Sequence, residues 1–226
     1  METIWKVAEN FVTSGMYKID TTNFTIYYTN KSDEMVEELL NTLLVNMNRI
    51  LQFFKLKELE NKTDIIIYSS IDEYIKHINA CNQAYYEWMI ADTFDGKINI
   101  LSIDICRKTN EHSNINVEEY SKLIIHEFVH ICQQEVNPNS YGCEWFWEAL
   151  ATNLADQKME RPKEICTRDE LMFNYAGIPN AYSISYYLGQ YMLQKLSYEK
   201  IYGYVLKPEI LWNDTETLLY EFRREL

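Results

Sequence analysis

The feature that most constrains the fold is a long apolar segment with three polar residues at its centre. Residues 117–135 contain no glycine or proline, which predicts one continuous helix. Within it, residues 123–131 are apolar on nearly every side of that helix except at His126, Glu127 and His130. This pattern is typical of a helix buried in a core, where polar side chains need partners.

The spacing of these three residues suggests what the partner is. His126 and His130 are four residues apart, so on a helix both side chains point the same way and can bind one metal ion. Glu127 lies beside them, where such a metal site needs a group that activates water. The alternative is a pair of histidines hydrogen-bonded inside the core, but the spacing together with the glutamate favours two metal ligands and a general base.

Both ends of this helix carry recognisable signals. Asn116, followed three residues later by Glu119, predicts a capping box at the start. Pro138 is expected to end the helix. A turn at residues 137–142 then leads to a second, mostly apolar helical segment at residues 145–155, which predicts a helix-loop-helix hairpin.

Zinc bound by two histidines needs a third protein ligand, and a catalytic site leaves the fourth position to water. Glu148 is the best candidate, because the hairpin would fold it back toward the histidines, and the small residues Ala149 and Ala151 would let the two helices approach closely. Glu144, one turn earlier, remains a rival ligand. An ion-paired core carboxylate is less expected, since no lysine or arginine lies between residues 123 and 157.

With these two motifs the chain resembles the gluzincin branch of the zincin metallopeptidases, and more narrowly the small peptidase-MA-like domains. In that family a His-Glu-x-x-His helix is followed by a helix with the pattern Trp-x-x-Glu-Gly-x-Ala. Here Trp145, Glu148 and Ala151 match the second pattern, whereas Ala149 replaces the usual glycine. The two helices cover about forty residues, and the rest of the chain agrees with the family by pattern alone.

The resemblance implies an α+β, zincin-like fold. A small N-terminal mixed β-sheet with helices would lie over the motif helix, and a helical C-terminal lobe would follow. Because the chain has no composition break, we expect one metallopeptidase domain over residues 1–226, with an α/β lobe at about 1–136 and a helical lobe at about 137–226.

The implied activity is zinc-dependent hydrolysis of peptide bonds in a peptide or protein substrate, with Glu127 as the general base for the attacking water. In such peptidases a later tyrosine or histidine often stabilises the oxyanion, and Tyr182 is the candidate here, in a local match at residues 181–188. A different class also remains open: a catalytically inactive zinc-binding regulatory or interaction protein on the same fold. A third alternative is a helical interaction module in which the motif is accidental.

One position of the second motif helix departs from larger gluzincins, which often carry an acidic residue there to orient a zinc-bound histidine. That position is Thr152. Its hydroxyl, or neighbouring Asn153, is expected to supply a weaker contact of this kind.

Periodicity outlines the remaining elements. Strands are expected at residues 23–28, 64–68 and 97–102, and helices at 33–57, 71–79, 167–175, 182–196, 198–206 and 214–225. In the resembled family the strand before the motif helix forms the edge of the sheet and pairs with extended peptide, and by position this strand is 98–101. The alternative is that it is an ordinary inner strand.

Composition excludes several functional classes. A net charge of −13 without a basic patch argues against nucleic-acid binding. The five cysteines are odd in number and scattered, which indicates ordinary buried thiols. No apolar run has the length of a membrane span and the start lacks the layout of a signal peptide, so we expect a cytoplasmic location. His77 and His112, outside the motif, are expected at the surface.

Overall fold

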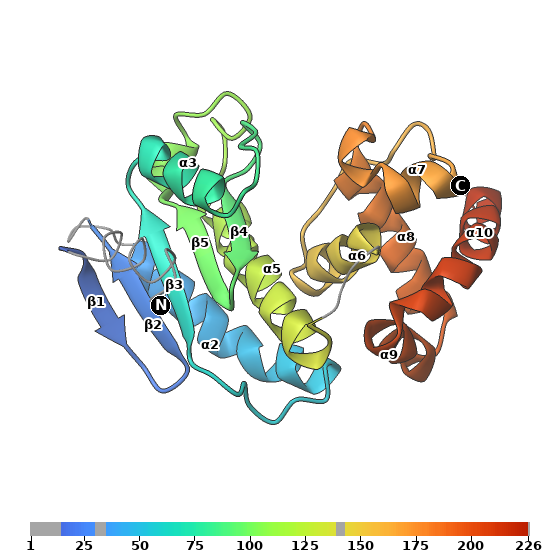
Figure 1. Ribbon diagram of the computed structural model, residues 1–226, viewed down its shortest axis with the longest axis horizontal. Coiled ribbons are helices and arrows are strands. Elements are labelled where there is room, and N and C mark those ends of the chain that lie inside the picture. The colour runs from blue at the N-terminus through green and yellow to red at the C-terminus, as the bar shows by residue number, and fades with distance from the viewer. Residues whose placement is uncertain (1–14, 30–34, 139–142, 226) are drawn as a thin grey trace. The chain divides into compact units, whose positions relative to one another are not determined.

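The computed structural model describes residues 15–29, 35–138 and 143–225 (Figure 1). These residues form a mixed α/β structure that divides into two compact units. One consists of Glu58–Ile131 and the described part of Met1–Asn48, and the other of Arg49–Lys57 and the described part of Cys132–Leu226. The expected single domain, with lobes meeting near residue 136, stays a prediction.

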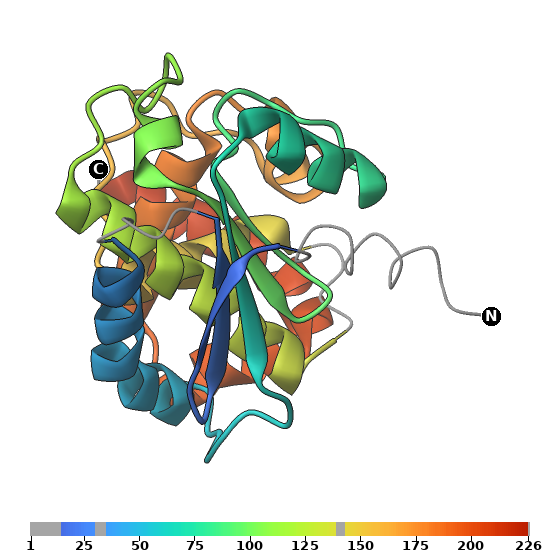
Figure 2. The ribbon, with the colours of Figure 1, turned by 90° about the vertical axis from the view of Figure 1, so that its left-hand side faces the viewer.

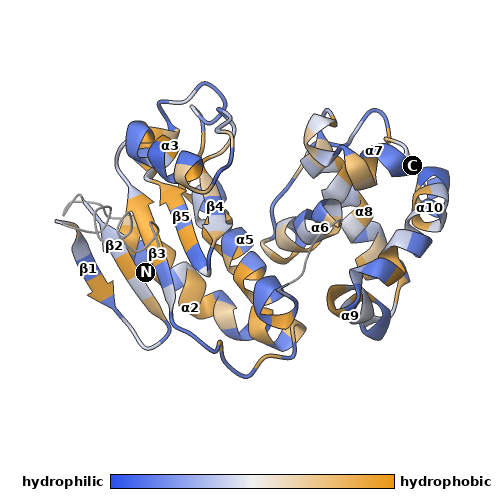
Figure 3. Ribbon diagram, viewed as in Figure 1, coloured by the Kyte–Doolittle hydropathy of each residue, from blue (hydrophilic) through white to orange (hydrophobic). Residues whose placement is uncertain are grey.

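The first unit contains a five-stranded mixed sheet with the order β1-β2-β3-β5-β4. Its strands are β1 (Tyr17–Asp20), β2 (Phe24–Tyr28), β3 (Thr63–Tyr68), β4 (Ala91–Phe94) and β5 (Lys97–Leu101). The three inner strands β2, β3 and β5 are parallel, and β1 and β4 run antiparallel to their neighbours at the two ends. Figure 3 shows hydrophobic, orange stretches in β3 and β5, as expected for strands covered on both faces.

The register assigns alternate residues to opposite faces of the sheet. Ile98 of β5 lies opposite Thr93 of β4 on one face. Asn99 and Asp92, the next pair along the two strands, lie on the other face.

Helices of the first unit cover both of these faces (Figure 2). The face of Thr93 meets α5 (Val117–Val136), where the rings of Phe24 and Phe128 pack edge to face at 5.7 Å. The face of Asp92 meets α3 (Ile71–Ala80), where the Tyr68 and His77 rings stack at 5.8 Å. Figure 2 shows α2 (Met35–Phe53) on the same side as α5. A short helix, α4 (Ile103–Cys106), directly follows β5.

Helix α5 begins with the predicted capping box. The Asn116 side chain accepts from the Glu119 backbone N–H at 2.9 Å, and the Glu119 carboxylate accepts from the Asn116 N–H at 3.2 Å. The helix ends at Val136, two residues before Pro138, as predicted. Part of the expected turn at 137–142 lies outside the described residues.

The second unit is helical throughout its described part. It contains α6 (Glu144–Leu154), α7 (Arg168–Phe173), the 3-10 turn η1 (Tyr175–Gly177), α8 (Ala181–Lys195), α9 (Tyr198–Leu206) and α10 (Pro208–Glu225). The expected change from a sheet-containing N-terminal part to a helical C-terminal part is therefore confirmed. Helices α6 and α8 are joined by Asn153, whose side-chain amide donates to the carbonyls of Ala149 at 2.8 Å and Tyr186 at 2.9 Å.

Two strands and one short helix were not predicted, and the strand β4 changes an expectation. Of the two alternatives for residues 98–101, the inner strand is correct, because β5 pairs with β3 on one side and β4 on the other. The strand at that end of the sheet is β4. Its sequence, Ala-Asp-Thr-Phe, has too little apolar alternation to indicate a strand.

Candidate metal centre

The two motif histidines face one another on α5. Their Nε2 atoms are 3.1 Å apart, and the ring planes are inclined at 79°. Two imidazole nitrogens bound to one tetrahedral zinc would be separated by about 3.3 Å, given Zn–N distances of about 2.0–2.1 Å. His126 is only 6% exposed, and His130 is half-buried. The two nitrogens are therefore about as far apart as two ligands of one metal ion.

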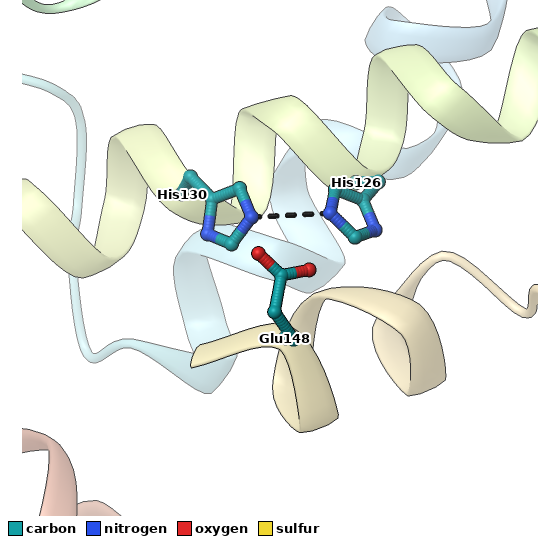
Figure 4. A group of neighbouring side chains, drawn as sticks. All are labelled: His126, His130 and Glu148. Carbon is teal, nitrogen blue, oxygen red and sulfur yellow. Dashed lines mark hydrogen bonds between the residues drawn. The ribbon is translucent and has the colours of Figure 1, made fainter. Parts of the chain in front are cut away.

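Helix α5 continues into the second unit, where its last turns meet α6. There the Gln133 side-chain amide donates to the Trp147 carbonyl at 3.1 Å. The next residue, Glu148, forms a group with His126 and His130 in which one ligand atom from each lies within 4.8 Å of the others. Figure 4 shows the Glu148 carboxylate directed at both rings.

The group has the chemistry of a metal site. Two neutral imidazoles and one carboxylate suit zinc, and three protein ligands leave a coordination position for water. The rival Glu144 is exposed on the first turn of α6 and is not part of the group. The described residues therefore bring together the three predicted ligands in an arrangement that could hold a metal ion.

Glu127 is 5% exposed, and strand β4 supplies its hydrogen-bond partner. The Thr93 hydroxyl lies 2.7 Å from the Glu127 Oε2 atom and 3.0 Å from the Glu127 carbonyl oxygen. Burial raises the pKa of the Glu127 carboxyl, while His126, His130 and the hydroxyl of Thr93 act in the opposite direction. A carboxyl with a raised pKa is better suited to accept a proton from water than an ordinary surface glutamate.

The expectation that His77 lies at the surface is wrong, because its side chain is only 8% exposed. Its Nε2 atom lies 3.1 Å from the Asp92 carboxylate, and the Asn99 amide donates to the same carboxylate oxygen at 3.3 Å. The other expected surface histidine, His112, is half-buried and lies 3.1 Å from the Trp88 carbonyl oxygen. Sequence alone could not reveal the pairing of His77 with Asp92, because the two residues lie on separate elements.

Tyr182, the proposed oxyanion donor, lies in the first turn of α8 and is half-buried. Its ring packs edge-on against Tyr175, with 6.3 Å between the centroids. The Tyr175 hydroxyl forms a hydrogen bond with Ser185 at 3.0 Å, and burial followed by the Glu148 charge raises its pKa. Tyr182 thus belongs to an aromatic pair whose other member is near Glu148, and its catalytic role stays a prediction.

The side chains of Thr152 and Asn153 form hydrogen bonds within the second unit, and the contact expected from one of them to a zinc-bound histidine stays a prediction. The Thr152 hydroxyl is 2.6 Å from the carbonyl of Glu148, four residues earlier in the same helix. Asn153 uses its amide to join α6 to α8. Both residues therefore help to stabilise α6, the helix that carries Glu148.

Thr93 was not predicted from the sequence. Its strand is short, and one threonine carries no periodic signal. The clue available from sequence was the Asp95-Gly96 turn before β5, which predicts a two-residue hairpin and hence a partner strand at residues 91–94.

The five cysteines are all free thiols, as expected. Four are buried and Cys166 is half-buried. Burial raises the pKa of Cys81 to about 12 and that of Cys166 to about 11. These thiols are therefore protonated near neutral pH, which makes them poor nucleophiles and poor metal ligands.

None of the described helices is both long and apolar enough to cross a membrane. In comparisons with known proteins, no family model matches the chain and no curated protein is significantly similar to it.

Proposed function

We propose that this chain is a zinc-dependent peptidase with a zincin-like fold of the gluzincin type. The proposal rests on one observation: the grouped ligand atoms of His126, His130 and Glu148, with the buried Glu127 next to the first of them. A purely structural zinc site is closed by four protein ligands and has no use for a general base. Three ligands and a buried carboxylate therefore favour catalysis.

His126, His130 and Glu148 would hold the ion. When bound, zinc acts as a Lewis acid and lowers the pKa of water toward neutrality. Glu127 would accept a proton from the attacking water and later deliver it to the leaving amine. Its buried carboxylate is held by the Thr93 hydroxyl, which limits its freedom to rotate away.

The substrate would be an extended peptide or an unfolded part of a protein. Strand β4 ends the sheet among the described residues, so one side of it is available for a further strand. Adding a peptide there would provide recognition through main-chain hydrogen bonds without a strict sequence requirement. The net charge of −13 argues against a nucleic-acid substrate.

Attack on a peptide carbonyl creates an oxyanion that needs a hydrogen-bond donor. We assign this role to Tyr182, which is half-buried and packs against Tyr175. Burial, and then the charge of Glu148, raise the pKa of Tyr175.

Two variants separate the base from the third ligand. Glu127→Gln keeps the shape of the side chain but cannot take a proton, so zinc content should stay near one ion per chain while peptide cleavage falls by about 100- to 10,000-fold. Glu148→Ala should instead weaken zinc retention, because it removes a ligand. Zinc is measured by mass spectrometry, and cleavage with a peptide library digested with and without a chelator.

The outcome also decides between the proposal and its alternatives. Stoichiometric zinc without chelator-sensitive cleavage would favour the inactive zinc-binding protein. Stoichiometric metal in a variant lacking both histidines would remove the metal assignment altogether.

A further inference from the structure

Thr93 contacts Glu127 through its side chain. The hydroxyl has one hydrogen for two acceptors on Glu127, and the carboxylate oxygen, at 2.7 Å, is closer than the carbonyl oxygen, at 3.0 Å. A hydrogen bond to a charged oxygen is stronger than one to a neutral carbonyl. The contact therefore orients the Glu127 carboxylate as well as joining β4 to α5.

The backbone N–H and C=O groups of Thr93 point away from the neighbouring strand β5. In an antiparallel pair, residues alternate between those that exchange hydrogen bonds with the partner strand and those whose N–H and C=O groups point away from it. Leu101 donates to the Ile90 carbonyl at 2.9 Å, which makes this pair a hydrogen-bonded one. The register then makes the pair of Asp92 and Asn99 a hydrogen-bonded one as well. Ala91 and Thr93 lie between these pairs, so their backbone N–H and C=O groups point away from β5.

Side chains on the opposite face of β4 also form hydrogen bonds. Asp92, the neighbour of Thr93, accepts hydrogen bonds from His77 at 3.1 Å and Asn99 at 3.3 Å. The side-chain amide oxygen of Asn99 accepts in turn from the Tyr68 hydroxyl at 3.3 Å. These polar contacts hold a strand of only four residues in a defined position, so a displacement of Thr93 would also disturb its partners.

We propose that Thr93 is a positioning residue that couples peptide binding to the general base: its backbone receives the extended substrate at the outer edge of β4, while its hydroxyl orients the Glu127 carboxylate. This proposal rests on the peptidase function proposed above. It accounts for the hydroxyl that this strand directs at Glu127 of α5. A peptide paired with Thr93 would lie beside the base.

The first test compares Thr93→Val with Thr93→Ser. Valine keeps the shape and the backbone N–H but lacks the hydroxyl, so kcat should fall by about tenfold or more while KM and zinc content stay within about twofold. Serine restores the hydroxyl and should recover most of the lost kcat. The measurement uses the most rapidly cleaved member of a synthetic peptide library. The matched control is Thr63→Val, the same change on the same face of β3, two strands away in the sheet.

The second test needs neither zinc nor a substrate. Urea unfolding of the chelator-treated protein is followed for Thr93→Val, Glu127→Leu and the double variant. If the hydroxyl contacts the carboxylate, the shifts in unfolding midpoint will not add, because the second substitution removes a contact that the first has already lost.

Several results would overturn the proposal. A wild-type kcat in Thr93→Val, an equal loss in Thr63→Val, or no recovery in Thr93→Ser would each remove the positioning role while leaving the peptidase function intact. Additive midpoint shifts would remove the contact itself. A zinc-loaded wild-type protein that cleaves no peptide would instead remove the proposed function, and the positioning role with it.

Discussion

Glu127 and His77 are both buried against strand β4, and each is bonded to the residue of β4 that faces it. Thr93 bonds to Glu127 on one face of the strand, and Asp92 bonds to His77 on the other. The alternation of side chains along a strand brings these two neighbours to opposite helices. Burial of an ionisable side chain is tolerated here because each has a hydrogen-bond partner.

At this scale sequence predicted the metal group but not its surroundings. His126 and His130 could be recognised because helical spacing relates them within one element. Glu148 could be predicted because a hairpin was expected between two helices that follow one another in the sequence. Thr93 could not be identified, because its contact with Glu127 joins residues 34 positions apart in the chain. The same holds for His77, whose burial depends on Asp92 and on the ring of Tyr68.

Tyr182 permits a direct test of the oxyanion donor. Tyr182→Phe keeps the ring that packs against Tyr175 and removes only the hydroxyl, so folding and zinc content should barely change. The turnover number should fall by roughly ten- to a thousandfold, the usual scale for the loss of one such donor. Steady-state kinetics with a library peptide would measure this.

The control for that variant is Tyr187→Phe. The Tyr187 hydroxyl donates to the Met159 carbonyl at 3.3 Å, so its removal should affect stability rather than turnover. Full activity in Tyr182→Phe would mean that this tyrosine only packs, and Tyr186 on the same helix would be examined next.

Among the elements, those with strong periodicity were predicted best. Helix α5 was expected at 117–135 and spans Val117–Val136, and strand β3 was expected at 64–68 and spans Thr63–Tyr68. Strands β1 and β4 have mixed polar sequences, and they exist because a neighbouring strand offers them hydrogen bonds. Since β4 was missed, the end of the sheet could not be placed correctly.

The crossing of α6 and α8 depends on a glycine. Gly189 of α8 lies against Asn153 and Ala149 of α6. A Cβ atom at Gly189 would lie 2.6 Å from the Asn153 amide nitrogen and 2.8 Å from the Ala149 carbonyl oxygen. Both distances are too short for a side chain, so only glycine fits there without a shift.

Gly189→Ala is therefore expected to lower the free energy of unfolding by about 1–3 kcal/mol, the usual cost of overpacking a tight contact. The change should also weaken zinc retention, because Asn153 and Ala149 belong to the helix that carries Glu148. Gly203→Ala is the matched control in α9, where an added Cβ meets nothing within 4 Å. It should stabilise by about 0.5–1 kcal/mol through the better helix propensity of alanine. If Gly189→Ala and Gly203→Ala changed the free energy of unfolding in urea equally, a close contact at Gly189 would be contradicted.

For the whole molecule, the division of the chain into units was the least predictable property. Segment Arg49–Lys57 belongs to the second unit although it follows most of α2 in the first. It contacts two helices of that unit. The Arg49 guanidinium donates to the Leu154 carbonyl of α6 at 2.7 Å, the Tyr198 hydroxyl of α9 donates to the Phe53 carbonyl at 2.6 Å, and Lys55 lies over the Tyr202 ring at 4.4 Å. Helical periodicity runs unbroken through residue 49, so sequence alone gave no sign of this boundary.

Zinc should stabilise the folded molecule, because a ligand that binds only the native state shifts the unfolding equilibrium toward it. At a free zinc concentration 100 times the Kd, the gain is about 2.7 kcal/mol. For a chain of this size that corresponds to a rise of roughly 5–10 °C in Tm. Calorimetry of chelator-treated and zinc-loaded protein would measure it.

The rise in Tm should also depend on pH in a defined direction. Protons compete with zinc for its protein ligands, so the zinc-dependent gain should be present at neutral pH and become smaller in acid. His126→Ala/His130→Ala should show no gain at either pH, because two of the three grouped ligands are gone. Calcium is the control ion for the wild-type protein, since it prefers six or more oxygen ligands and should leave Tm unchanged. A zinc-dependent rise that persists in the double variant would show that the ion binds elsewhere.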